Sequence, residues 1–214
     1  MKKVLCSFGF GEHAQLLSLA APTFYIYSHN HNYDLFIPSL SYFSEETKKR
    51  HPSWWKIELI GQLFDKYDQV LWIDSDIIIC RFDKDIMDDL PPEKDTGLVV
   101  HQTDDGYVPN CGVWPLNKSC LSWFHKLWPL NDFRRSSCWW EQAAMLSLLG
   151  VDPDKSVIDM SPNADNILWQ QLDYVWNPHI NDARKIPDDT RFFHATSFKN
   201  RYSAMKNILQ QINI

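Results

Sequence analysis

Hydrophobic residues in the first third of the chain fall into short blocks with strand-like and helix-like spacing. The mostly apolar block Val4–Phe8 predicts a buried strand. His13–Ala21 predicts a short helix that ends at Pro22, because proline lacks the N–H that a helix interior needs. The β-branched and aromatic run Thr23–Tyr27 predicts a second strand. In Ser53–Tyr67, apolar residues recur every three or four positions, which predicts an amphipathic helix capped by its first residue.

The same alternation continues to the end of the chain. Gln69–Ile73 predicts a fully buried strand, and the apolar run resumes at Ile77–Ile79. Further strands are predicted at Gly97–Val100, Gly112–Leu116, Lys155–Met160 and Arg191–His194, and helices at Leu121–Trp128, Trp139–Leu149 and Ser203–Ile212. Strands that alternate with helices indicate an α/β fold with a mainly parallel central sheet flanked by helices. We expect one domain over residues 1–214, either a whole protein or a piece of a longer one.

Composition narrows the range of partners. The 21 Lys and Arg against 27 Asp and Glu give a net charge of −6, which disfavours general binding to nucleic acid or anionic lipid. Five cysteines without a CxxC spacing argue against a disulfide framework or a structural zinc site. The N-terminal apolar run stops by Ser7, too short for a signal peptide, and no run approaches the ~20 apolar residues of a membrane span. We therefore expect a soluble, cytoplasmic protein with no nucleic-acid partner and no integral membrane segment.

Two acids interrupt an apolar strand in the segment around Asp74-Ser75-Asp76. Burying an unpartnered carboxylate costs several kcal/mol, which disfavours an accidental placement. Residues two apart on an extended chain point to the same side, so Asp74 and Asp76 could share one divalent cation whose other ligands are phosphate oxygens. The alternative is that the strand ends at Ile73 and both acids are solvated turn residues.

Other polar residues follow at strand and helix ends. His194 closes an apolar-aromatic strand and could be a third metal ligand, a mixed oxygen and nitrogen set that suits Mn²⁺ better than Ca²⁺. Lys199 could then neutralise a diphosphate. Asn110 precedes Gly112 and offers both a donor and an acceptor to sugar hydroxyls. Each also has an ordinary reading, as a core histidine, a surface lysine or a turn, and the acid Glu141 suits a first helical turn without any ligand.

Taken in order, these motifs resemble the galactosyl- and xylosyltransferases of glycosyltransferase family 34. The resemblance covers most of the chain, from about Tyr25 to Lys199, and the Asp-x-Asp segment is its sharpest part. It is carried by Tyr25, His31-Asn32-Tyr33-Asp34, Trp54-Trp55-Lys56, Tyr67-Asp68, Leu71-Trp72-Ile73-Asp74-Ser75-Asp76, Asn110-x-Gly112, Glu141-Gln142 and His194…Lys199. We expect no membrane anchor in this chain, whereas the family usually has one, and the sequence reads Trp-Glu-Gln where the family usually has one more acid. It also resembles a glycosyltransferase domain at the N-terminus of a large chlorella-virus protein, which implies the host cytoplasm if the chain is viral.

The resemblance implies a single Rossmann-like GT-A domain, a UDP-sugar donor, a glycan acceptor, Mn²⁺ (or Mg²⁺) and transfer of a hexose-type sugar with retention of configuration. It implies catalytic roles for Glu141, Gln142 and Asp76, and metal binding by Asp74, Asp76 and His194. It implies donor binding by Ser7, Phe8, Lys56, Asp74, Ser75, Asn110 and Lys199. Retention requires either a carboxylate nucleophile, for which Glu141 is the candidate, or attack on the face from which the leaving group departs.

Two other functions remain open at this point. A phosphatase of the haloacid dehalogenase type also carries Asp-x-Asp after a buried strand, although that motif usually lies near the first strand. A non-catalytic carbohydrate-binding module would use the abundant Trp side chains, 10 in all, as stacking surfaces for sugars. The sequence does not indicate an oligomeric state.

Overall fold

The structure is a computed structural model that describes residues 1–103, 106–132, 136–150 and 167–213. Within these ranges seven strands form one sheet in the order β2-β1-β3-β7-β5-β6, with β8 paired to β5. The strands are β1 (Lys3–Cys6), β2 (Tyr33–Phe36), β3 (Gln69–Ile73), β5 (Thr96–Thr103), β6 (Gly106–Asn110), β7 (Val113–Asn117) and β8 (Trp169–Leu172). A second, two-stranded sheet pairs β4 (Ile77–Ile79) with β9 (Phe192–His194).

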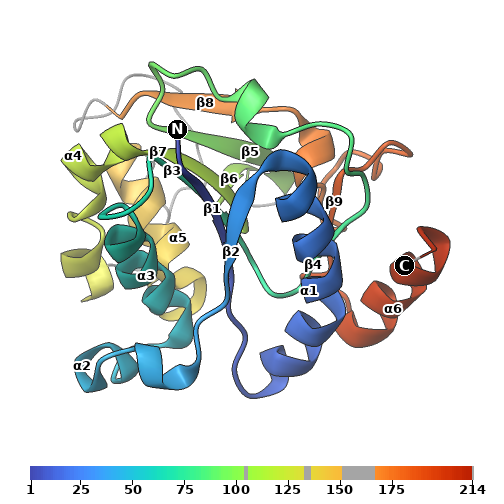
Figure 1. Cartoon of the computed structure of the whole chain (residues 1–214), viewed down its shortest axis with the longest axis horizontal. Coiled ribbons are helices and arrows are strands. Elements are labelled where there is room, and N and C mark those ends of the chain that lie inside the picture. The colour runs from blue at the N-terminus through green and yellow to red at the C-terminus, as the bar shows by residue number, and fades with distance from the viewer. Residues whose placement is uncertain (104–105, 133–135, 151–166, 214) are drawn as a thin grey trace.

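The seven-stranded sheet is mainly parallel, as the sequence predicts. β1 runs parallel to β2 and β3, and β5 runs parallel to β8. β7 is antiparallel to both β3 and β5, which gives β3 and β5 the same direction, and β6 is antiparallel to β5. Five of the seven described strands therefore point the same way, and their carboxyl ends meet along one edge of the sheet (Figure 1).

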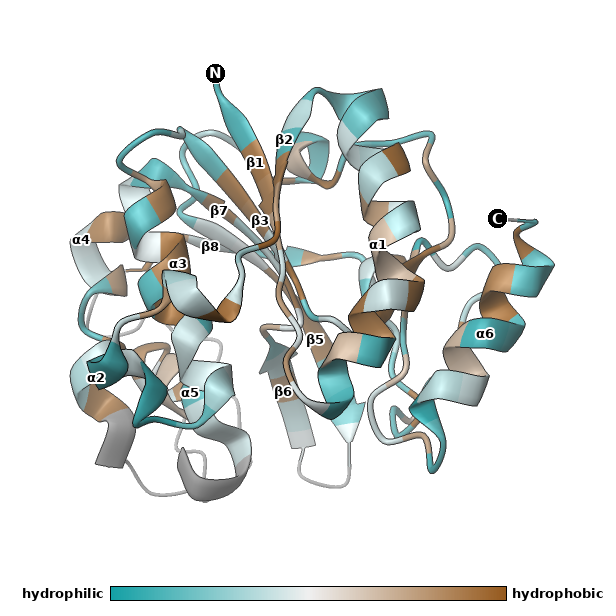
Figure 2. Cartoon of the chain, turned by 60° about the horizontal axis from the view of Figure 1, so that its bottom comes forward, coloured by the Kyte–Doolittle hydropathy of each residue, from teal (hydrophilic) through white to brown (hydrophobic). Residues whose placement is uncertain are grey.

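Helices cover both faces of this sheet (Figure 1). They are α1 (Glu12–His31), α2 (Glu45–Lys48), α3 (Trp55–Leu63), α4 (Leu121–Phe124), α5 (Ser136–Leu148) and α6 (Arg201–Gln211). One core cluster joins the strands to α3, α4 and α5, and a second joins them to α1 and α6. Hydrophobic colouring accordingly concentrates along β1 and β3, whereas α6 alternates between hydrophilic and hydrophobic bands (Figure 2).

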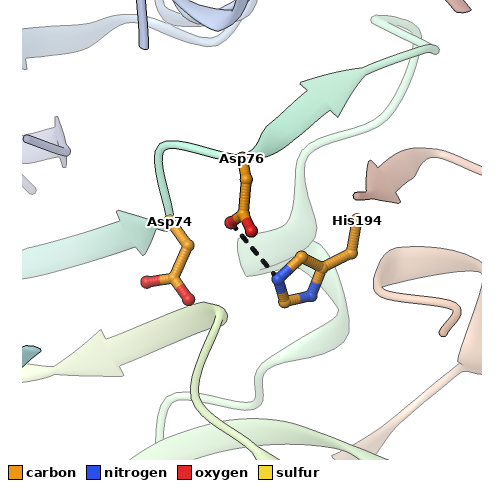
Figure 3. Close-up of side chains that lie close together, drawn as sticks. All are labelled: Asp74, Asp76 and His194. Carbon is orange, nitrogen blue, oxygen red and sulfur yellow. Dashed lines mark ion pairs between the residues drawn. The ribbon is translucent and has the colours of Figure 1, made fainter. Parts of the chain in front are cut away.

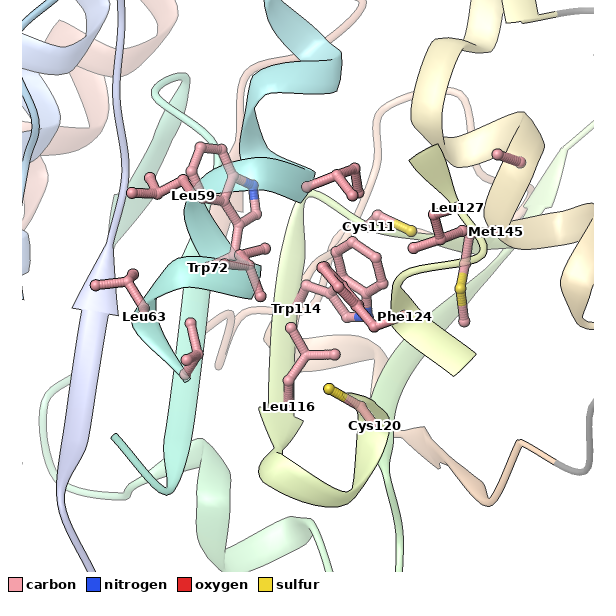
Figure 4. Packing of buried hydrophobic residues seen from close by; sticks show 14 of the residues in the cluster. Leu59, Leu63, Trp72, Cys111, Trp114, Leu116, Cys120, Phe124, Leu127 and Met145 are labelled. Atoms are coloured by element: carbon pink, nitrogen blue, oxygen red, sulfur yellow. The ribbon is translucent and has the colours of Figure 1, made fainter. Parts of the chain in front are cut away.

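The central position of β3 in the sheet explains why its sequence is continuously apolar. Val70 and Trp72 belong to the first core cluster, and Leu71 and Ile73 belong to the second. All four are at most 2% exposed, because a strand in the middle of a sheet with helices on both faces has no solvated side. Figure 4 shows Trp72 packed near Leu59 of α3 within the first cluster.

The predicted boundary at Pro22 is wrong. Pro22 lies inside α1, and Thr23–Tyr27 continues the helix instead of forming a strand. The buried residues of α1 recur every three or four positions across the proline, at Leu16, Ala20, Thr23, Phe24 and Tyr27, and this stripe packs on the second cluster. Tertiary burial of that stripe outweighs the local cost of proline. The helix ends where Asn32 adopts a left-handed conformation (φ 57°), and the second strand is β2, which we did not predict.

The other predicted elements have mixed outcomes. Strands were correctly expected at β1, β3, β5, β7 and β9, and the apolar run Ile77–Ile79 forms β4. Ser53 does not cap α3, because a 3₁₀ turn over Pro52–Trp54 precedes this helix and His51 caps the turn. The predicted strand Lys155–Met160 lies outside the described residues. No helix in the described part of the chain has the length and apolar character needed to cross a membrane.

Candidate active site

The turn between β3 and β4 places the two acids of the Asp-x-Asp motif. The Asp74 N–H donates to the Gly112 carbonyl oxygen at 2.8 Å, which holds the end of β3 against the start of β7. Asp76 immediately precedes β4, and its carbonyl oxygen accepts from the Ala195 N–H at 2.9 Å. Because Ile77 pairs with His194 in the small sheet, the β4–β9 pairing brings His194 next to Asp76.

Asp74, Asp76 and His194 form a cluster with the geometry of a metal site (Figure 3). One ligand atom from each residue lies within 4.8 Å of the other two. His194 Nε2 is 3.4 Å from Asp76 Oδ1, and both residues are buried. Burial raises the pKa of the Asp76 carboxyl, but the nearby charges of His194 and Arg201 outweigh this and lower it below its usual range. The Asp76 carboxylate is therefore ionised although it is buried, because positively charged neighbours compensate for the loss of solvent.

Asn177 fixes the orientation of the histidine. Its Oδ1 lies 2.9 Å from His194 Nδ1, so the Nδ1–H donates to the amide oxygen and Nε2 is the ring nitrogen that faces the aspartates. The Asn177 amide N–H donates in turn to Asn110 Oδ1 at 2.8 Å, and the Asn177 carbonyl oxygen accepts from His101 at 2.7 Å. Sequence reasoning missed Asn177, because it lies in a loop without a motif around it.

Gly112 lies against the cluster, and its lack of a side chain leaves room beside His194 and Asp74. A Cβ atom at this position would lie 2.7 Å from His194 Cε1, 2.8 Å from Asn110 Oδ1 and 3.1 Å from Asp74 Oδ2. Any other residue would therefore fill the space between the candidate ligands. The open space and the mixed oxygen and nitrogen donors fit a divalent cation of the Mn²⁺ type.

Lys56 connects the candidate metal site to Glu141. This lysine is fully buried, and its Nζ lies 3.0 Å from Asp74 Oδ1 and 2.7 Å from Glu141 Oε1. Burial lowers the pKa of the Lys56 ammonium, but the two carboxylates outweigh this and raise it. Burial also raises the pKa of Glu141, with Lys56 acting in the opposite direction. Glu141 Oε2 is buried and has no hydrogen-bond partner among the described residues.

A cavity of about 970 Å³ opens over these groups. It contains most of the predicted site residues, namely Phe8, Lys56, Asp74, Ser75, Asp76, Asn110, Glu141, Gln142 and His194. The Gln142 Oε1 accepts from the Asn110 amide at 2.9 Å, which joins two of the predicted site residues. Two predicted residues do not line the cavity: Ser7, which is buried, and Lys199, which is exposed.

Arg201 and His13 line the cavity and were not predicted. Arg201 Nη1 lies 3.3 Å from Asp76 Oδ2 and 3.5 Å from His13 Nε2, and His13 Nδ1 lies 2.9 Å from Ser75 Oγ. Arg201 begins α6, two positions after Lys199. The role of Lys199 therefore stays a prediction, and the cationic side chain of this segment that lines the cavity is that of Arg201.

Comparisons with known proteins give a match in structure only. No protein-family model and no curated protein sequence matches the chain. Among solved structures, a glycosyltransferase involved in glycosylation of the major capsid of PBCV-1 superposes with a TM-score of 0.70 at 17% identity, over 98% of this chain and 100% of that one.

Two further glycosyltransferase structures share the architecture. GlyE of Streptococcus pneumoniae TIGR4 gives a TM-score of 0.60 at 15% identity, over 100% of this chain, which spans 64% of the GlyE chain. Mouse xyloside xylosyltransferase 1 gives 0.50 at 11% identity, over 92% of this chain and 98% of that one. The chain therefore has the fold of the GT-A glycosyltransferases.

Proposed function

We propose that this chain is a metal-dependent glycosyltransferase that transfers a hexose-type sugar from a UDP-sugar to a glycan hydroxyl, with retention of configuration. One observation carries the proposal. Asp74, Asp76 and His194 converge at the carboxyl end of β3, around the space kept open by Gly112, in a cavity that also holds Asn110, Glu141 and Gln142. Ligands in open α/β sheets bind at this edge.

The residues around the cavity suggest distinct tasks. Asp74 Oδ2, one oxygen of Asp76 and His194 Nε2 would hold a divalent cation, which would neutralise charge on the departing diphosphate. Arg201 is a second cation on the same side, and its side chain is 39% exposed, so it can turn from Asp76 to a phosphate oxygen. Asn110, Gln142 and the unpartnered Glu141 Oε2 offer donors and acceptors for the hydroxyls of the sugar.

In the transfer, the bond from the anomeric carbon to the diphosphate oxygen breaks and a bond from the acceptor oxygen to that carbon forms. The acceptor hydroxyl proton passes to the departing diphosphate oxygen, which lies on the same face of the sugar. Glu141 Oε1 is held by the Lys56 ammonium, which lowers the nucleophilicity of this carboxylate. We therefore favour same-face attack over a covalent intermediate on Glu141. The glycosyltransferase structures that share this fold support glycosyl transfer over a haloacid-dehalogenase phosphatase.

The decisive experiment is calorimetric titration of the protein with UDP, with and without Mn²⁺, in the wild type and in Asp76→Ala. We expect UDP binding that requires Mn²⁺ and is lost in Asp76→Ala. Binding of sugars without nucleotide or metal would instead identify a carbohydrate-binding module. Failure to bind either UDP or GDP under both conditions would refute the proposal.

A further inference from the structure

Lys56 is held by charge in a place where a lysine alone would be unfavourable. The side chain comes from α3, is fully buried, and makes ion pairs of 3.0 Å to Asp74 and 2.7 Å to Glu141. Its Nζ also lies 5.1 Å from the centre of the Trp72 ring. One of its carboxylate partners belongs to the candidate metal cluster, and the other lies outside that cluster.

Each carboxylate gives one oxygen to Lys56 and keeps the other. Asp74 Oδ1 accepts from both Lys56 and the Trp72 indole N–H at 2.7 Å, so only Oδ2 is left to face the space beside Gly112. Glu141 Oε1 accepts from Lys56, and Oε2 has no partner among the described residues. The single ammonium therefore divides its charge between two anions that serve different parts of the cavity.

We propose that Lys56 is a positioning residue that links the charge on Glu141 to the metal affinity of Asp74. This proposal rests on the proposed function only in taking Asp74 as a metal ligand. If Glu141 loses its charge, Asp74 becomes the sole counter-ion of the Lys56 ammonium. The ammonium then neutralises more of the negative charge on Asp74, and less of that charge is left to attract a cation. Removing the carboxylate charge from residue 141 therefore weakens metal binding, although Glu141 is not a metal ligand.

The test is a Mn²⁺ titration of the full chain, read from the electron paramagnetic resonance signal of free Mn²⁺. We expect Glu141→Gln to raise the Mn²⁺ dissociation constant about tenfold, the size of a nearby unit charge in a partly screened site. The matched control is Glu58→Gln, which makes the same chemical change two positions after Lys56 on α3. Because Glu58 bonds to Gln62 and not to Lys56, we expect no change there. Equal Mn²⁺ affinity in the wild type and Glu141→Gln would overturn the proposal.

A double-mutant cycle tests whether the effect of Glu141 passes through Lys56 or comes directly from the closeness of Glu141 to the metal site. In a Lys56→Met background, Glu141 has no counter-ion and takes up a proton, so adding Glu141→Gln leaves the Mn²⁺ affinity unchanged. The same tenfold loss in both backgrounds would show that Lys56 transmits nothing.

Lys56→Met leaves a buried carboxylate without its partner and can fail to fold. The double variant Lys56→Met/Glu141→Gln removes both charges, so we expect it to unfold at a higher temperature than Lys56→Met alone. If the double variant unfolds at a lower temperature than Lys56→Met alone, the ion pair between Lys56 and Glu141 does not have the role proposed for it. A wild type that binds no Mn²⁺ would refute the proposed function, whereas normal wild-type binding with an unaffected Glu141→Gln refutes only the link.

Discussion

The floor and the rim of the cavity are built differently. On the floor, Asp76, His194 and Asn177 are buried and joined by short polar contacts. On the rim, His51 stacks on Trp140 with ring centroids 4.2 Å apart and an angle of 7°, and the Trp140 backbone has a positive φ of 47° inside α5. The floor is held by satisfied polar groups and the rim by aromatic contact at the expense of backbone strain.

This difference implies that the two parts respond differently to mutation. A preorganised polar floor loses ligand affinity when a single contact is removed, because its other groups were placed for that contact. The rim can lose a side chain and still keep the fold, and its backbone strain can even be relieved. The following predictions test this contrast, beginning with the largest expected effect.

The largest effect is expected at Gly112. In Gly112→Ala, the new Cβ lies within 3 Å of His194 and Asn110, whose side chains are held by hydrogen bonds, so the candidate ligands must separate. We expect Mn²⁺ affinity to fall by about 100-fold or more, since ligand geometry sets metal affinity. The measurement is the same Mn²⁺ titration. Gly61→Ala is the control, because a Cβ at Gly61 of α3 meets no atom within 4 Å. Comparable losses in the two variants would contradict the assignment.

Asn177 should have the next largest effect. In Asn177→Leu, His194 Nδ1–H loses its acceptor and the imidazole is no longer fixed with Nε2 toward the aspartates. We expect Mn²⁺ affinity to fall by about 10- to 100-fold, as for other residues that orient a metal ligand. Asn177→Asp retains the acceptor for Nδ1–H but loses the donor to Asn110 Oδ1, so we expect a smaller loss than in Asn177→Leu. An unaltered affinity in Asn177→Leu would show that His194 is oriented by something else.

The buried His101, which bonds to Asn177 on the floor of the cavity, makes the stability of the protein depend on pH. Burial lowers the pKa of His101 to about 3, with the hydrogen bond to the Asn177 carbonyl partly opposing this. The unfolded chain binds a proton near pH 6.5 and the folded chain does not, so stability falls as pH drops from about 6.5 toward 3. We expect His101→Gln to remove about 3 kcal/mol of the stability loss between pH 6.5 and 4. Urea unfolding at the two pH values measures it, and an unchanged pH dependence would contradict the prediction.

The smallest effect concerns strain at the rim. Glycine adopts a positive φ without steric cost, whereas alanine at Trp140 keeps the strain. We expect Trp140→Gly to be more stable than Trp140→Ala by about 1 kcal/mol, the reverse of the usual order inside a helix. Thermal unfolding of the two variants compares them directly. If the alanine variant is the more stable one, the backbone at residue 140 is not strained.

Sequence reasoning succeeded where burial is continuous and failed where distant segments meet. β3 is apolar on both faces, so its pattern could be predicted without knowing its neighbours. Pro22 misled the prediction, because the stripe from Leu16 to Tyr27 gains more from packing on the sheet than proline costs locally. Asp74, Asp76 and His194 were identifiable because acids and a histidine end apolar strands.

The supporting residues could not be predicted in the same way. Asn177 and Arg201 act through contacts with His194 and Asp76, and no spacing near either residue marks that contact. The bridge at Lys56 likewise depends on α3 and α5 packing on one face of the sheet. A local sequence pattern identifies polar residues that are unusual in an apolar segment. Only the tertiary structure shows which other polar residues contact them.

The β4–β9 pairing has a consequence for biosynthesis. Asp76 emerges from the ribosome long before its partners, because 125 positions separate it from Arg201 and His194 comes only shortly before that residue. The parallel strands β1, β2 and β3 lie wholly within the first 73 residues and can pair without the C-terminal segment. Chain closure over such a distance is entropically slow, so the contacts of Asp76 with His194 and Arg201 form among the last events of folding. A nascent chain can therefore form much of its sheet before the cluster of Asp74, Asp76 and His194 exists.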